Sequence, residues 1–129
     1  MGFRYTISTE ITFSSSHALR GYNGDCASVH GHNWVVRVYY DFEMLDPNGF
    51  TIDYRELKDR LEKVIFPRYD HVHLNDSAPF DTVNPTSENL AAEIFKLCRK
   101  EVVIENGTLA EVELWETPTD MVRYCEDTI

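Results

Sequence analysis

Two long stretches of alternating residues constrain the fold of this chain more than any other feature. Apolar and polar side chains alternate through residues 3–17, and the same pattern returns in residues 30–43. Successive side chains of a strand point to opposite faces, so each stretch predicts a strand with one buried and one solvated face. Residues 18–29, which contain turn-forming glycines, predict the loop that joins these strands.

Histidines stand on the buried faces of both predicted strands. His17 ends the first stretch in phase with Phe13, and His30 and His32 begin the second in phase with Trp34. A lone histidine on such a face is most simply a core residue with a hydrogen-bond partner. Three that converge from neighbouring strands favour a metal site instead. Neutral imidazole is a common zinc ligand, and a catalytic zinc keeps three protein ligands and one open position.

Cys26 lies in the loop before His30 and leaves two alternatives open. A thiolate near a metal can accept a proton from a substrate C–H group, which makes the site catalytic. As a fourth ligand, the same thiolate would instead close a structural zinc module. The enzyme hypothesis predicts that Cys26→Ala keeps the metal and loses turnover, whereas the structural hypothesis predicts loss of metal and fold.

The middle of the chain predicts two helices. Asp53 is the expected N-cap of the first, with Glu56 completing a capping box, and Pro67 is expected to end it. Thr86 is the expected cap of the second helix, at about residues 87–103. Both carry apolar residues at helical spacing, so each is expected to bury one face.

Two shorter strands are expected at about residues 109–117 and 120–126, separated by a turn at Pro118-Thr119. The resulting order is two strands, two helices and two strands. This order predicts an α+β domain over residues 1–129, a four-stranded antiparallel sheet with both helices packed on one face.

Two further places carry candidate acid–base groups. Asp70 precedes His71 in a loop, and the two would form a proton-transfer pair if the carboxylate contacts the imidazole. Glu116 ends a predicted strand in phase with Val112 and Leu114. A carboxylate on an apolar face is costly to bury without a partner, so Glu116 is either an exposed strand end or a ligand-binding group.

Composition argues against several classes of partner. The 22 acidic and 12 basic residues give a net charge of −10, which disfavours nucleic-acid binding. No apolar run approaches the roughly 20 residues of a membrane helix. The three cysteines are an odd number without a secretion signal, which indicates a reducing, cytoplasmic setting.

Six ordered motifs together resemble the 6-pyruvoyl-tetrahydropterin synthase / 6-carboxytetrahydropterin synthase family. They are Phe13-Ser14-Ser15-Ser16-His17, Cys26 with His30-Gly31-His32-Asn33, Gly49-Phe50-Thr51-Ile52-Asp53, Asp70-His71 with Leu74-Asn75, Pro85-Thr86-Ser87-Glu88-Asn89, and Glu116-Thr117. The resemblance covers nearly the whole chain. It implies the tunnelling fold, in which three sheets close a barrel and two trimers stack as a homohexamer with active sites at subunit interfaces.

The resemblance also implies roles for individual residues in a zinc enzyme acting on 7,8-dihydroneopterin triphosphate. His17, His30 and His32 would bind Zn²⁺, and Cys26 would be the general base. His71, oriented by Asp70, would take part in the proton relay. The pterin would be held by the group Glu116, Thr86, Ser87 and Glu88. Arg20 and Arg68 are candidate cations for the triphosphate.

The spacing between Cys26 and His30 bears on the product. Three residues separate them, as is usual in carboxy-forming relatives of queuosine biosynthesis, whereas pyruvoyl-forming relatives usually have five. The sequence therefore favours formation of 6-carboxytetrahydropterin, with acetaldehyde and triphosphate released. The alternative is a 6-pyruvoyl-tetrahydropterin synthase, which eliminates triphosphate only.

Overall fold

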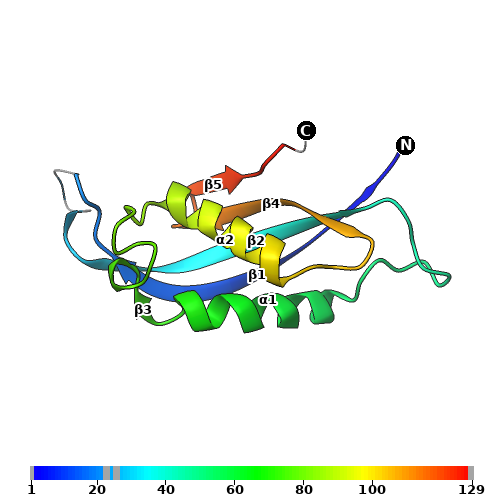
Figure 1. Cartoon of the computed structure of the whole chain (residues 1–129), viewed down its shortest axis with the longest axis horizontal. Helices are drawn as coiled ribbons and strands as arrows, with labels where there is room; N and C mark the ends of the chain where they lie inside the picture. Colours follow the sequence, from blue (N-terminus) through cyan, green and yellow to red (C-terminus); the bar gives the residue numbers. More distant parts are fainter. Residues whose placement is uncertain (1, 22–23, 25–26, 128–129) are drawn as a thin grey trace.

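A five-stranded sheet carries two helices on one face (Figure 1). The computed structural model describes residues 2–21, 24 and 27–127. The long strands β1 (Tyr5–His17) and β2 (His30–Phe42) pair antiparallel over their whole length. β4 (Gly107–Trp115) pairs with the other edge of β2, and β5 (Met121–Tyr124) pairs with β4. The predicted α+β class is confirmed.

The sheet has one strand more than the four that the sequence predicts. The additional strand, β3 (Val72–His73), runs parallel to β1 opposite Ser15 and Ser16, and it leads into the short 3-10 helix η2 (Leu74–Asp76). Two residues are too few for an alternating pattern, so the strand exists through its tertiary pairing alone. The wholly antiparallel arrangement is thus wrong at this edge, while the β1, β2, β4 and β5 pairings are antiparallel as expected.

Helices α1 (Tyr54–Tyr69) and α2 (Ser87–Glu101) begin at the predicted caps. The Asp53 side chain accepts the N–H of Arg55 at 2.7 Å, and Thr86 Oγ1 accepts the N–H of Asn89 at 3.1 Å. The prediction that Pro67 ends α1 is wrong, because the helix continues to Tyr69. Proline has no N–H and so removes one helical hydrogen bond. In the last turn few further bonds depend on that position, so the helix can continue to its end.

The core lies between the sheet and the helices. α1 lies against β1, while α2 covers β4 and β5 (Figure 1). Most in-phase residues of the first two strands are buried as predicted, and the group comprises Ile11, Phe13, Trp34, Val36, Val38, Tyr40 and Phe42. Phe3 and Tyr5, at the start of the first predicted stretch, are exposed instead. Within the described residues, no helix is long and apolar enough to cross a membrane.

The other face of the sheet is not covered by a helix and carries ion pairs between strands. Arg37 Nε lies 2.8 Å from Glu10, and Arg123 lies 2.9 Å from Glu111 and 3.0 Å from Glu113. Cross-strand pairs of opposite charge stabilise a solvated face only modestly. The apolar pattern of the covered face therefore determines the register of β1 and β2.

Candidate metal centre and its surroundings

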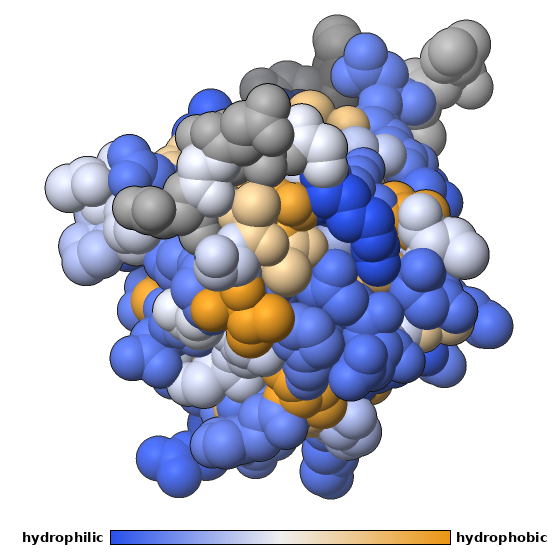
Figure 2. Space-filling view, turned by 90° about the vertical axis from the view of Figure 1, so that its left-hand side faces the viewer, coloured by the Kyte–Doolittle hydropathy of each residue, from blue (hydrophilic) through white to orange (hydrophobic). Residues whose placement is uncertain are grey.

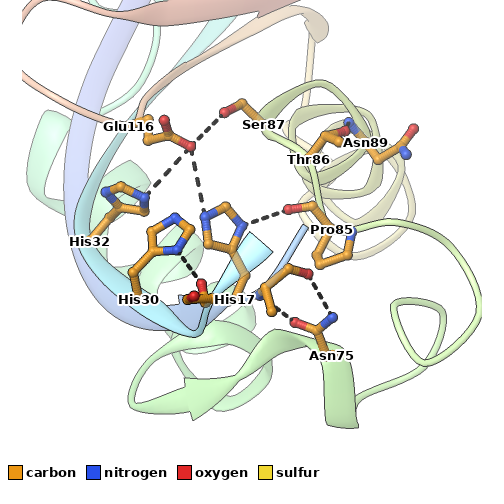
Figure 3. A network of polar contacts seen from close by, with 11 residues as sticks. His17, His30, His32, Asn75, Pro85, Thr86, Ser87, Asn89 and Glu116 are labelled. Atoms are coloured by element: carbon orange, nitrogen blue, oxygen red, sulfur yellow. Dashed lines mark hydrogen bonds and ion pairs between the residues drawn. The ribbon is translucent and has the colours of Figure 1, made fainter. Parts of the chain in front are cut away.

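Three histidines converge at one end of the covered face. His17 faces His30 directly in the β1–β2 register, and His32 is two residues farther along β2. Their ring centroids lie 4.5–5.1 Å apart, and one ring nitrogen of each lies within 4.8 Å of those of the other two. The cluster predicted from the alternation is thus brought together as expected (Figure 3).

Backbone carbonyls fix the tautomer of two of the rings. His17 Nδ1 lies 2.7 Å from the carbonyl oxygen of Pro85, and His30 Nδ1 lies 2.7 Å from that of Ser28. A carbonyl only accepts, so in both rings Nδ1 carries the proton and donates it. In the neutral rings Nε2 is then the atom with a free lone pair, which is the arrangement a metal ligand requires.

Burial favours the neutral form of two of the three rings. Desolvation lowers the pKa of His17, and it also lowers that of His32, against the attraction of the Glu116 carboxylate. The Nε2 atoms of His17 and His32 are buried and have no hydrogen-bond partner among the described residues. Two unpaired nitrogens beside a third are costly unless a further group binds them. The donor set and its orphaned nitrogens therefore fit a metal ion.

Glu116 points at the same place from the end of β4. Its Oε1 lies 3.9 Å from His17 Nε2 and 3.7 Å from His32 Nε2. Ser87, the first residue of α2, donates to the same oxygen at 3.0 Å (Figure 3). The side chain is 29% exposed, so the carboxylate lies at the mouth of the cluster and can be reached from outside. Of the two alternatives for Glu116, this geometry favours the ligand-binding group.

Asp70 and His71 form a contact of their own at the edge of the sheet. Asp70 Oδ2 lies 3.0 Å from His71 Nδ1, and Oδ1 accepts the backbone N–H of Ser14 at 2.9 Å. The bond from Ser14 is the largest of several that lower the pKa of Asp70. The His71 side chain is 82% exposed. In the described residues no hydrogen bond or ion pair joins this pair to the histidine cluster.

The remaining candidate residues differ in where they lie. Thr86 and Ser87 are both half-buried at the start of α2, whereas Glu88 is exposed on its first turn. Cys26 lies outside the described residues. The guanidinium of Arg20, a candidate for the triphosphate, donates to the carbonyl oxygens of Phe80 at 2.7 Å and Val83 at 3.0 Å. Arg20 therefore ties two loops together.

The surface around the cluster is mostly polar. Figure 2 looks onto this end of the molecule and shows hydrophilic residues around a small apolar group. A shallow cavity of about 500 Å³ lies beside this end of β1, and its lining includes Ser14, Ser16, Asn33, His71 and His73. Ser14, Ser16 and Asn33 alternate with the clustered histidines along their strands, so this cavity belongs to the uncovered face of the sheet, and His71 adjoins it.

The hydrogen bonds that two asparagines make in this region were not predicted from the sequence, although Asn75 belongs to one of the family motifs. Asn75 and Asn84 each make two hydrogen bonds to the backbone that follows His17. Asparagine in a proline-containing loop is a known signal for side-chain-to-backbone bonding. The partner, which lies 57 or 64 residues away, follows only from the tertiary structure.

Comparison with known proteins identifies a family. The model of the family 6-pyruvoyl tetrahydropterin synthase matches residues 6–127. The chain is 34% identical over 124 residues to the 6-carboxy-5,6,7,8-tetrahydropterin synthase of Synechocystis sp., with 93% of this chain and 92% of the relative covered. It is 32% identical over 131 residues to the 6-pyruvoyl tetrahydrobiopterin synthase of Pongo abelii, with 92% and 89% covered.

A solved structure agrees with these relatives. The 6-pyruvoyl tetrahydropterin synthase of Caenorhabditis elegans superposes with a TM-score of 0.81 at 28% identity, and 96% of each chain is covered. The single-chain architecture of the tunnelling fold expected from the sequence motifs is thereby confirmed. The chain belongs to the 6-pyruvoyl tetrahydropterin synthase family.

Proposed function

We propose that this protein is a zinc-dependent 6-carboxy-5,6,7,8-tetrahydropterin synthase of the cytoplasm. Its reaction would convert 7,8-dihydroneopterin triphosphate and water to 6-carboxytetrahydropterin, acetaldehyde and triphosphate, for queuosine biosynthesis. The observation that carries the proposal is the convergence of three histidine rings beside Glu116. Relatives named as carboxy-forming synthases, at 34%, 27% and 30% identity, support the choice of reaction.

His17, His30 and His32 would hold the zinc ion through Nε2. When bound, zinc would polarise a side-chain oxygen of the substrate and make a neighbouring C–H group more acidic. The carbonyls of Pro85 and Ser28 hold two of the rings in the required tautomer before any metal arrives.

Cys26 and His71 would move the protons. A thiolate at Cys26 would take a proton from the substrate side chain, which requires a depressed thiol pKa. His71 donates Nδ1–H to Asp70, so its Nε2 is the atom that would exchange protons with the substrate. Asp70 would thus orient the imidazole, as a carboxylate does in other acid–base pairs.

Glu116 would anchor the pterin. Ser87 occupies one carboxylate oxygen, and the remaining lone pairs are free to accept from the two N–H groups of the guanidine-like pterin edge. Thr86 Oγ1 accepts from Asn89, which leaves its O–H as a donor to the ring. Thr86, Ser87 and Glu88 would therefore bind the pterin beside Glu116.

Assembly as a homohexamer, a dimer of trimers, is part of this proposal. Among the described residues, β1 has no strand partner on its outer edge from Tyr5 to Ser14, and an open edge of that length invites pairing with another chain. The exposed His71 is separate from the histidine cluster of its own chain. Both features suit active sites that are completed between subunits.

The second candidate function is that of a 6-pyruvoyl-tetrahydropterin synthase. Relatives with that activity in their names are 32% and 31% identical to this chain, close to the carboxy-forming ones. The two reactions differ in the fate of the substrate side chain. The three-residue spacing between Cys26 and His30 favours the carboxy-forming reaction.

Product analysis tests the proposal. The zinc-loaded protein is incubated with 7,8-dihydroneopterin triphosphate, the pterin is identified by mass spectrometry, and acetaldehyde is assayed. Carboxytetrahydropterin with an equal amount of acetaldehyde is the expected result. A pyruvoyl pterin without acetaldehyde would establish the second candidate function instead.

Cys26→Ala separates both enzymes from a structural zinc module. The expected result is a folded variant that binds one equivalent of zinc but has lost turnover. Loss of metal and of the folded state together would mean that Cys26 is a fourth ligand. Cys98→Ala is a poor control because Cys98 is buried in the core, so the exposed Cys125→Ala is preferred.

A further inference from the structure

A ring of contacts begins and ends at the metal ligand His17. From the imidazole, the first contact is the 2.7 Å hydrogen bond to the carbonyl oxygen of Pro85 (Figure 3). Asn84 precedes Pro85, and its side chain binds the backbone of Arg20. Arg20 lies three residues after His17. Two stretches of chain, residues 17–20 and 84–85, are thus closed into a ring by hydrogen bonds.

The contact between Asn84 and Arg20 is a double one. Asn84 Oδ1 accepts the Arg20 N–H at 2.9 Å, and Asn84 Nδ2 donates to the Arg20 carbonyl at 2.9 Å. One amide side chain therefore satisfies both backbone groups of one residue, as a paired strand would. Asn89 Nδ2 donates to the Asn84 carbonyl at 2.8 Å, which fixes the backbone on the other side of the ring.

Asn75 makes the same double contact without closing such a ring. Its Oδ1 accepts the Ala18 N–H at 2.9 Å, and its Nδ2 donates to the Ala18 carbonyl at 2.9 Å. Asn75 belongs to η2, and its described hydrogen bonds do not reach Pro85. Each asparagine thus makes the same pair of hydrogen bonds to one backbone residue shortly after His17. They differ in that only Asn84 is directly linked to Pro85, whose carbonyl binds His17.

We propose that Asn84 is a positioning residue for the metal centre. By fixing Arg20 to the chain segment of Pro85, it holds the Pro85 carbonyl against His17 Nδ1, so that the proton stays on Nδ1 and Nε2 stays available to the metal. This proposal rests on the zinc site of the proposed function and extends it to a residue outside the ligands. Groups that orient a metal-binding histidine commonly change metal affinity when altered.

Two measurements on Asn84→Ala test the proposal. Zinc affinity is measured by competition with a chelating dye, and the expected result is a weakening of about tenfold, at the lower end of the effect of such orienting groups. The tautomer of His17 is measured in the metal-free protein by ¹⁵N NMR of the imidazoles. Nδ1–H alone is expected in the unaltered protein, and a mixture with Nε2–H is expected in the variant.

Matched variants control for the loss of an asparagine as such. Asn75→Ala removes an equal pair of bonds and is expected to weaken zinc binding less than Asn84→Ala, with the His17 tautomer unchanged. Asn48 lies in the turn before α1, at the opposite end of the sheet, so Asn48→Ala is expected to change neither the zinc affinity nor the His17 tautomer. Equal weakening by Asn75→Ala and Asn84→Ala would overturn the proposal, because it would make general loosening of the loop the cause.

A second variant and measurements of melting temperature and turnover distinguish a positioning role of Asn84 from a purely structural one. If Asn84→Ala does not fold, Asn89→Ala removes the bond to the Asn84 carbonyl and is expected to weaken zinc binding more than Asn48→Ala does. A lower melting temperature with unchanged zinc affinity and tautomer would overturn the proposal. Absence of zinc binding in the unaltered protein would overturn it together with the zinc site. Absence of turnover with the expected zinc affinities would overturn the proposed function alone.

Discussion

The two histidine-bearing groups of this protein, the three-histidine cluster and the Asp70–His71 pair, are both attached to β1 but are built differently. The cluster stands on the covered face, with His17 fully buried and its rings in edge contact. The pair lies at the edge of the same strand and binds both backbone groups of Ser14. Ser14 donates its N–H to Asp70, and its carbonyl accepts the N–H of His71 at 2.6 Å.

This difference in burial suits the two groups to different tasks, metal binding and proton transfer. Burial lowers the pKa of His17 and leaves the Nε2 atoms of His17 and His32 without a partner among the described residues, so a bound metal would satisfy them. His71 keeps its contact with water, so it can exchange protons, and the carboxylate beside it fixes its orientation. One group is thus suited to hold an ion, and the other is suited to transfer a proton.

Removing one histidine of the cluster should have the largest effect on zinc affinity and turnover. His17→Ala is expected to weaken zinc binding by about a hundredfold or more, since it removes one of three protein ligands from a kind of site that binds zinc with about 10–16 kcal/mol in total. Turnover should be lost with the metal. His73→Ala, which removes a histidine that contacts Ser16 outside the cluster, is the control for zinc affinity. Unchanged zinc affinity in His17→Ala would mean that the cluster is not the metal site.

Removing the imidazole of the pair should affect turnover and leave the metal in place. His71→Gln is expected to lower kcat by about 10²–10⁴-fold, the usual contribution of a positioned acid–base group. Zinc affinity should remain that of the unaltered protein because His71 makes no described contact with the cluster. The test measures kcat and zinc affinity on the same preparation. A parallel loss of both would show that the two groups are not separable.

The alternation of the strands allowed the cluster to be predicted from the sequence. A period of two residues places His30 and His32 on one face with Trp34, and the same period places His17 with Phe13. Once β1 and β2 pair, the three rings must meet. The side chains of a paired strand leave almost no freedom of direction, which is why this part of the site follows from local rules.

The pair and the second layer of the cluster depend on tertiary contacts. Asp70 and His71 touch because His71 adopts a φ of 59°, a left-handed conformation that no pattern indicated. The carbonyl of Pro85, which binds His17, is 68 residues away in sequence. The two residues of β3 and the continuation of α1 past Pro67 likewise follow from pairing and packing, because local propensity does not predict either of them.

Two buried aromatic side chains of β2, one near the histidine cluster and one at the far end of the strand, distinguish core packing from support of the metal site. Trp34 and Phe42 are both buried in the covered face, and truncation of either to alanine is expected to cost about 3–5 kcal/mol of unfolding free energy. The Trp34 ring also lies 5.3 Å from that of His17 and 5.0 Å from that of His32. Trp34→Ala alone should therefore weaken zinc binding in the folded protein.

Denaturant titration and zinc competition on both variants provide the measurement. Equal losses of stability with unequal losses of zinc affinity are expected. Equal zinc affinities would mean that the rings of the cluster hold their places without the indole.

The smallest effect concerns acid stability at the Asp70–His71 pair. The bond from the Ser14 N–H holds the pKa of Asp70 below its usual value of 3.8, so the folded state binds this proton more weakly than the unfolded state. The resulting stability is present above pH 3.8 and is lost as the pH falls through the folded pKa. Its size should stay below about 1 kcal/mol, because the pair is near the surface.

Asp70→Asn keeps a side-chain oxygen for the Ser14 N–H and removes the titration. The difference in unfolding free energy between the unaltered protein and Asp70→Asn should therefore shrink between about pH 5 and pH 2, measured by denaturant titration at each pH. Glu113 on the uncovered face, whose pKa is lowered against the effect of burial by its hydrogen bonds with Tyr39 and Arg123, contributes equally to both proteins and cancels. If the difference in unfolding free energy stays constant with pH, the Ser14 contact does not favour the charged carboxylate. Asp70 would then orient His71 no differently from a neutral hydrogen-bond acceptor.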